Sequence, residues 1–310
     1  MDTVISILIP TKGRLEDLKR LLETLSDMSD RGTIAHEVIV VNNASDENTA
    51  RIVERLVAGY TGREGDRWRH VREPVPGKSR ALNRAIPLAK GKILGFLDDD
   101  VEVTPTWLRA TYDFFEQQRF EVKQGAIQIP PDMRTNEEFL KLLQRFRTIC
   151  YYGKPGDVVR EIKSLNAANI AIRREFLATV GLFDERIGPG VSGTSMDVEF
   201  GARVLRKGGH IGYEPKSVVY HHVDWSRLTE DYFRLRHEMQ GRSRLIYKRS
   251  PVLSILSNLL RSMATFCWYA MARNERKKYR AKGRYFHYRA MLKAKVRKPS
   301  QQSPVENVSP

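Results

Sequence analysis

The sequence has few cysteines, no long apolar segment near its first residue and no internal repeat. Cys150 and Cys267 are the only cysteines in 310 residues, so a disulfide scaffold is excluded and a reducing compartment is expected. The apolar run at residues 4–9 is too short for a secretory signal and is ended by Pro10. With 41% hydrophobic and 29% charged residues, the composition indicates a soluble globular protein.

Acidic residues are scarce at the C-terminal end, and this scarcity divides the chain by charge. Residues 242–310 hold 17 Lys and Arg against only two acidic residues, Glu275 and Glu306, a net charge of +15. The remaining residues carry only +1 of the total +16. We therefore expect a nearly neutral domain at 1–241, a basic helical extension at 242–298 and a disordered tail at 299–310, which is rich in Ser, Pro and Gln.

Short apolar runs alternate with segments of helical spacing in the first 100 residues. Strands are expected at 4–9, 37–41, 68–71 and 93–97, and helices at 15–25, 47–57 and 79–89. This alternation predicts an α/β fold with a mostly parallel, Rossmann-like sheet flanked by helices. Ligands of such sheets bind beyond the carboxyl ends of the strands. The polar loops at 10–14, 42–46 and 98–100 are therefore expected to lie close together.

Three adjacent carboxylates, Asp98, Asp99 and Asp100, end the strand expected at 93–97. Such a cluster is costly unless a cation neutralises it. Oxygen ligands suit Mg²⁺ or Mn²⁺, which proteins hold with one or two carboxylates plus substrate phosphates. The position at the ligand-binding edge favours a metal–diphosphate site over a solvated turn that caps the following helix.

Four basic residues, Lys12, Arg14, Lys78 and Arg80, lie in loops or helix starts at the same edge. Lys and Arg side chains there could hold the phosphates of a nucleotide. For any one of the four, ordinary surface charge is the competing interpretation.

Two later segments supply a candidate base and a candidate metal ligand. Asp197 follows the Gly-rich loop at 188–195 and could remove the proton of an attacking hydroxyl, or simply stabilise a helix N-terminus. His221 and His222 end the apolar run at 218–220, where a histidine could complete a metal shell or be structural.

Seven motifs together resemble the inverting glycosyltransferases of family two, which have the GT-A fold. They are ISILIPTKGR at 5–14, VVNNAS at 40–45, GKSRALN at 77–83, FLDDDV at 96–101, NIAIRR at 169–174, GLFDE at 181–185 and DVE at 197–199. The resemblance covers about 4–241. It implies transfer of a sugar from a nucleotide-sugar, most simply a UDP-sugar, to an acceptor hydroxyl with inversion. A lipid-linked glycan or a cell-surface polysaccharide precursor would be the acceptor.

The resemblance also implies roles for individual residues. Pro10 and Thr11 would line the nucleotide, and Asn42 stands where the family usually has an Asp that contacts the base. Asp98 to Asp100 match the D-x-D element for ribose, metal and diphosphate. Asp197 matches the general base, with Glu199 as the second choice, and His221 or His222 the late metal-contacting histidine. Two alternatives remain: a nucleotidyltransferase on a similar sheet, and a nucleotide-sugar or nucleic-acid binding protein without turnover.

The basic extension begins with an apolar stripe at 252–272 that is long enough to cross a bilayer. Arg261 near its centre argues against a span, as does the basic stretch at 273–298, which one crossing would export. We expect a helix that lies on the membrane or packs on the body, followed by a second helix at 276–295. Residues 250–298 would recruit a cytoplasmic enzyme to the anionic inner face of the membrane. Core packing and nucleic-acid binding are the competing interpretations.

Overall fold

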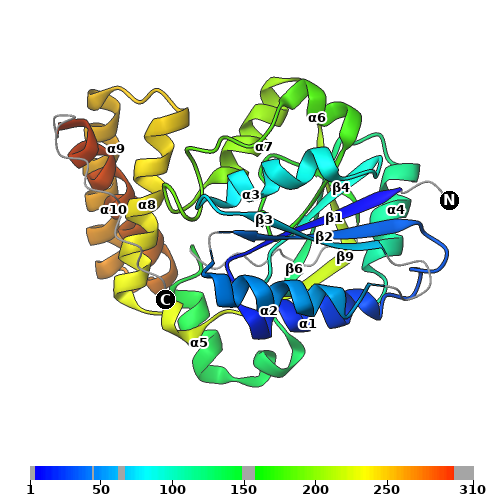
Figure 1. The fold of residues 1–310 in the computed structure, drawn as a ribbon. Helices are drawn as coiled ribbons and strands as arrows, with labels where there is room; N and C mark the ends of the chain where they lie inside the picture. Colours follow the sequence, from blue (N-terminus) through cyan, green and yellow to red (C-terminus); the bar gives the residue numbers. More distant parts are fainter. Residues whose placement is uncertain (1–3, 44, 62–66, 149–157, 297–310) are drawn as a thin grey trace. The chain divides into compact units, whose positions relative to one another are not determined.

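The computed structural model describes residues 4–43, 45–61, 67–148 and 158–296 (Figure 1). The chain forms two compact units. Unit 1 comprises 1–130, 152–185 and 196–222, and unit 2 comprises 131–151, 186–195 and 223–310. The domain ranges 1–241 and 242–298 stay a prediction, and the tail expected at 299–310 lies outside the described residues.

Unit 1 is built on one mixed sheet with the strand order β3-β2-β1-β4-β8-β6-β9-β5, and β7 pairs with β9. The strands are β1 (Ile5–Thr11), β2 (His36–Asn43), β3 (Arg67–Glu73), β4 (Ile93–Leu97), β5 (Val101–Val103), β6 (Val122–Gln128), β7 (Arg160–Ile162), β8 (Asn169–Arg173) and β9 (Ile211–His221). β3, β2, β1 and β4 are parallel neighbours, which confirms the Rossmann-like half. β8 joins β4 in antiparallel orientation, while β6 and β9 pair in parallel.

Helices cover both faces of this sheet, as the sequence predicts. They are α1 (Leu15–Ser26), α2 (Glu47–Ala58), α3 (Lys78–Ala85), α4 (Trp107–Gln117), α6 (Arg174–Val180) and α7 (Met196–Arg206), with the 3-10 turn η1 (Ile86–Leu88) after α3. In Figure 1, α1 and α2 lie on one face, and α3, α6 and α7 lie on the other. β1 and β2 are buried along their whole length because both faces are covered.

A buried lysine lies among these layers, a feature that the hydrophobic pattern does not reveal. Lys123 of β6 is fully buried, and its Nζ donates to Ser217 Oγ at 2.6 Å and Thr111 Oγ1 at 2.8 Å. Asn169 Oδ1 is 3.4 Å from the same nitrogen and accepts a hydrogen bond from Trp107 Nε1 at 3.0 Å. Burial lowers the pKa of Lys123 to about 7, although the charge of Glu214 opposes this.

Unit 2 is helical. Its elements are η2 (Pro131–Thr135), α5 (Glu137–Arg145), η3 (Trp225–Arg227), α8 (Glu230–Tyr247), α9 (Val252–Met271) and α10 (Glu275–Val296). α10 packs against α5, α8 and α9 (Figure 1). Gly283 permits the close approach to α8, since a Cβ there would lie 2.3 Å from His237 Nε2. Phe146, Phe233 and Tyr279 form the aromatic core of the bundle.

The two helices expected in the extension are present, and α9 and α10 match the expected ranges within one residue at each end. Within the described part of the chain, no helix is both long and apolar enough to cross a membrane.

Candidate functional site

The first loop and the acid cluster meet at the carboxyl edge of unit 1. β1 and β4 are parallel neighbours, so both end at the same edge of the sheet. Thr11 is the last residue of β1, and Asp98, Asp99 and Asp100 follow β4 directly. Thr11 Oγ1 donates to Asp99 Oδ2 at 2.6 Å and accepts from the Gly13 backbone N–H at 3.0 Å. The two loops are therefore joined through buried atoms, as the sheet topology predicts.

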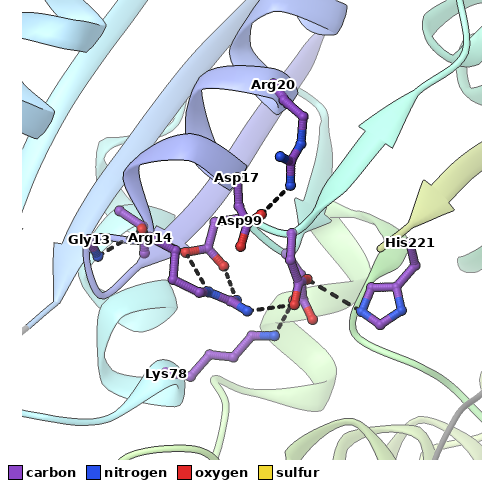
Figure 2. Close-up of polar contacts among 10 residues, drawn as sticks. Gly13, Arg14, Asp17, Arg20, Lys78, Asp99 and His221 are labelled. Carbon is purple, nitrogen blue, oxygen red and sulfur yellow. Dashed lines mark hydrogen bonds and ion pairs between the residues drawn. The ribbon is translucent and has the colours of Figure 1, made fainter. Parts of the chain in front are cut away.

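Two basic side chains pair with the three carboxylates of the acid cluster (Figure 2). Arg14 bridges two carboxylates: it pairs with Asp99, and its NH1 lies 2.6 Å from Asp100 Oδ2. Lys78, the first residue of α3, pairs with Asp98. Asp99 and Asp100 are 3% and 6% exposed, whereas the Arg14 side chain is 40% exposed, so the carboxylates are shielded from water on the side away from Arg14. Both bases are phosphate-binding candidates from the sequence, and here each is held by acids.

The electrostatics of the cluster depend on this pairing. Burial raises the pKa of the Asp99 carboxyl, while the Arg14 guanidinium lowers it and Asp100 raises it again. Burial alone would lower the pKa of Arg14, but the charges of Asp99 and Asp100 raise it above its ordinary value. Arg14 is thus a permanent cation between two buried acids, and its removal would leave their charges uncompensated.

The two histidines at the end of β9 face different partners. His221 Nε2 lies 3.5 Å from Asp100 Oδ1, so this ring faces the acid cluster. His222 Nε2 instead lies 2.7 Å from Glu102 Oε1, and Arg20 Nε is 3.6 Å from the same oxygen. Of the two candidate metal ligands, His221 is the one brought to the cluster.

Asp197 is anchored to the strand that borders the acid cluster. It lies in the first turn of α7, and its Oδ2 accepts a hydrogen bond from the Ala167 backbone N–H at 3.2 Å. Ala167 precedes β8, whose first residue Asn169 pairs with Leu97 immediately before Asp98. This connection places the half-buried Asp197 at the same edge of the sheet as the acids.

Of the four other candidates, Glu199 and Arg80 are paired with residues outside the acid cluster. Glu199 is 5% exposed and forms a two-pronged ion pair with Arg203, with distances of 2.8 and 3.0 Å. Arg80 pairs with Glu185 at 2.9 Å. Lys12 is exposed to solvent, while Pro10 is buried within β1.

The residues at the end of β2 hold the loop before α3. Asn42 is buried, and its Oδ1 accepts from Ser45 Oγ at 2.5 Å. Asn43, which the sequence analysis missed, accepts from the Gly77 N–H at 2.9 Å and donates to the Val75 carbonyl at 2.7 Å. The two adjacent asparagines at the end of the strand could have indicated this role from the sequence. Asn43 fixes the backbone that leads into Lys78.

Metal ligation is the part of the predicted site that the geometry supports least directly. Among the residues that the structure describes, no group of three or more His, Cys, Asp and Glu is arranged to hold a metal ion. Asp100 and His221 nevertheless face each other with their oxygen and nitrogen 3.5 Å apart, close enough for one cation to contact both. The Asp100 carboxylate suits Mg²⁺ or Mn²⁺, whose other positions water and substrate phosphates can fill.

Two curated relatives cover parts of the chain. An uncharacterized protein, y4gI, of Sinorhizobium fredii is 27% identical over 243 residues, covering 74% of this chain and 25% of the relative. A beta-monoglucosyldiacylglycerol synthase of Trichormus variabilis is 27% identical over 128 residues, covering 40% and 25%. The chain thus spans about a quarter of the length of these relatives.

Solved structures share the fold. The mannosyltransferase PcManGT from Pyrobaculum calidifontis, in complex with GDP-Man and Mn²⁺, superposes with a TM-score of 0.60 at 17% identity, covering 95% of this chain and 87% of that one. GalNAc-T7 with UDP, GalNAc and Mn²⁺ gives a TM-score of 0.56 at 15% identity, covering 82% and 53%. These likenesses establish a GT-A type α/β fold.

A family model bears on identity directly. The model described as glycosyl transferase family 2 matches residues 6–181, which is more than half of the 310 residues. The matched part contains the first loop, the acid cluster, Lys78 and β8. The chain therefore belongs to glycosyltransferase family 2.

Proposed function

We propose that the protein transfers a sugar from a nucleotide-sugar to an acceptor hydroxyl, with inversion and with the help of a divalent cation. The observation that carries this proposal is the meeting of acids and bases at one sheet edge. Asp98, Asp99 and Asp100 lie there with Arg14 and Lys78, and Asp197 is hydrogen-bonded to the segment beside them. A nucleoside diphosphate needs cations, and an attacking hydroxyl needs a base.

The acids of the cluster would bind the cation, and the two bases would bind the phosphates of the donor. Asp100 and His221, which already face each other, would hold Mn²⁺ or Mg²⁺, with Asp98 nearby. The cation, once bound, would neutralise the departing diphosphate as a Lewis acid. Arg14 and Lys78 then exchange their carboxylate partners for phosphate oxygens. Thr11 keeps Asp99 in place throughout through its 2.6 Å hydrogen bond.

Asp197 is the group proposed to take the proton from the acceptor. Its anchored Oδ2 leaves the carboxylate oriented, whereas Glu199 is occupied by Arg203. Removal of the proton lets the hydroxyl oxygen attack the anomeric carbon while the bond to the diphosphate breaks on the opposite face. A positioned base of this kind contributes about 10²–10⁴-fold in rate.

We also propose a UDP-sugar as donor and a lipid-linked glycan or polysaccharide precursor as acceptor, reached at the cytoplasmic face of the membrane. A beta-monoglucosyldiacylglycerol synthase among the relatives supports a glycolipid acceptor, and neighbours solved with UDP or GDP-Man support a uridine or guanosine nucleotide. The net charge of +15 on residues 242–310 supports attraction to anionic lipid.

A donor screen tests the proposal. Thermal shift of the full chain is measured with UDP- and GDP-sugars, with and without Mn²⁺, and cleavage of the stabilising donor is then followed. We expect one nucleotide class to stabilise the protein only together with Mn²⁺ and to be cleaved slowly in water. Stabilisation without cleavage would instead indicate a binding protein, and no stabilisation by any nucleotide-sugar would refute the proposed donor.

A further inference from the structure

α9 exposes a row of large apolar side chains to solvent. Leu253 is 81% exposed, Leu260 64%, Trp268 65% and Met271 74%. Leu256, Met263 and Cys267 are also exposed and fall at the same helical spacing. Residues three and four apart lie on one side of a helix, so these side chains form a continuous strip about 30 Å long. We refer to this strip as the outer face of α9.

The opposite side of α9, which packs against α10, carries both apolar and polar residues. Ile255 and Ser262 are buried there at 1% and 2% exposure. Ser262 Oγ donates to the Asn258 carbonyl at 2.7 Å, and Thr265 Oγ1 donates to the Arg261 carbonyl at 2.7 Å. Because the helix itself satisfies its hydroxyl, Ser262 can be buried at little cost. A surface helix of a water-soluble bundle carries polar residues at its exposed positions, whereas Leu253, Trp268 and Met271 of α9 are large, apolar and exposed.

The charges around the outer face indicate what covers it. No acidic residue occurs between Glu238 and Glu275. Lys248 and Arg249 precede α9, Arg273 and Arg276 follow it, and the exposed Arg261 lies on its flank. A second copy of the chain would bring the same positive charges to this face and be repelled, whereas anionic lipid would be attracted by each of them.

We propose that the outer face of α9 inserts into the interfacial layer of an anionic bilayer, with the helix parallel to the membrane plane. Leu253, Leu256, Leu260 and Met263 would enter the acyl boundary, and Trp268 would lie at the headgroup level. Arg261 would reach lipid phosphates along its aliphatic stem. The inference rests on the proposed function only for its purpose, which is to bring the enzyme to a lipid-linked acceptor.

Vesicle flotation of the full chain tests this docking surface. Vesicles of phosphatidylcholine alone are compared with vesicles containing about 30% phosphatidylglycerol, at low salt and at about 0.5 M salt. We expect binding to the anionic vesicles, weakened by salt. The double variant Leu253→Ser/Leu260→Ser should bind at least ~30-fold more weakly, because it loses two inserted leucines. The matched control Ile52→Ser/Leu88→Ser replaces exposed apolar residues of unit 1 and should bind as the unchanged protein does.

Several outcomes would overturn the inference. The inference is wrong if the unchanged protein does not bind anionic vesicles, or if the Leu253→Ser/Leu260→Ser variant binds them as well as the control variant does. Sedimentation could show a dimer that this variant dissociates, in which case a second copy occupies the face. An unaltered melting temperature would show that the variant is folded. Donor binding is measured on the same samples, so a failure of vesicle binding is separated from a failure of the proposed enzyme.

Discussion

The fully buried Lys123 makes the stability of unit 1 depend on pH in a predictable direction. Its pKa in the folded state is about 7, against an ordinary value of 10.5, because burial disfavours the charged amine. Between these values the unfolded chain binds a proton that the folded chain does not, so the free energy of unfolding rises with pH. The slope is about 1.4 kcal/mol per pH unit, or roughly 2–3 kcal/mol between pH 7 and 9.

Lys123→Met is expected to remove this dependence. The thioether side chain fits an apolar site, and the hydroxyls of Thr111 and Ser217, 3.1 Å apart, can bond to each other. Asn169 Oδ1 keeps its bond from Trp107. Urea unfolding of the unchanged protein and the variant at pH 7, 8 and 9 measures the difference between them, in which other titrating groups cancel. If the free energies of unfolding of the two proteins changed in parallel with pH, Lys123 would not be the group whose proton causes the dependence.

Three further outcomes are expected. Asp197→Asn should lower the transfer rate by about 10²–10⁴-fold while donor affinity measured by calorimetry is unchanged; undiminished turnover would move the base elsewhere. Asp100→Ala should abolish the Mn²⁺-dependent part of donor affinity, and an unchanged affinity with Mn²⁺ present would remove this role from Asp100. Burial lowers the pKa of both His237 and His287 to about 4. Their contribution to stability is therefore present above pH 6.5 and lost as the pH falls towards 4, by up to ~3 kcal/mol each. His287→Gln should remove about half of this loss in urea unfolding, and an unaltered acid profile would contradict it.

Local sequence patterns predicted the parallel half of the fold closely. β4 coincides with the expected strand, and α2 begins at the expected residue because Asp46 accepts the Thr49 N–H at its N-terminus. That the three loops follow strands ending at one edge of the sheet was predicted from topology, since β2 and β4 both pair with β1 in parallel. These features depend on periodicity and capping, which a single sequence contains.

Partner choice within the site could not be predicted in the same way. Nothing in the order of residues indicates that Arg14 bridges Asp99 and Asp100, or that Arg80 turns to Glu185. The sequence also does not indicate which side of α9 packs against α10 and which side faces solvent. Its apolar stripe was visible, but a stripe defines a side of a helix without saying what that side contacts. Packing of Ser262 towards α10 depends on a neighbour that begins more than ten residues later.

The bridge that Arg14 makes between Asp99 and Asp100 affects how strongly the binding of donor and the binding of cation depend on each other. A donor arriving alone finds Arg14 and Lys78 already engaged by acids, and a cation arriving alone finds the acids already engaged by bases. In the proposed function, a donor and a cation that bind together would give Arg14 and Lys78 phosphate partners and give Asp100 a metal partner. Donor and cation should therefore each tighten the binding of the other by the same factor, because binding of the two is thermodynamically coupled.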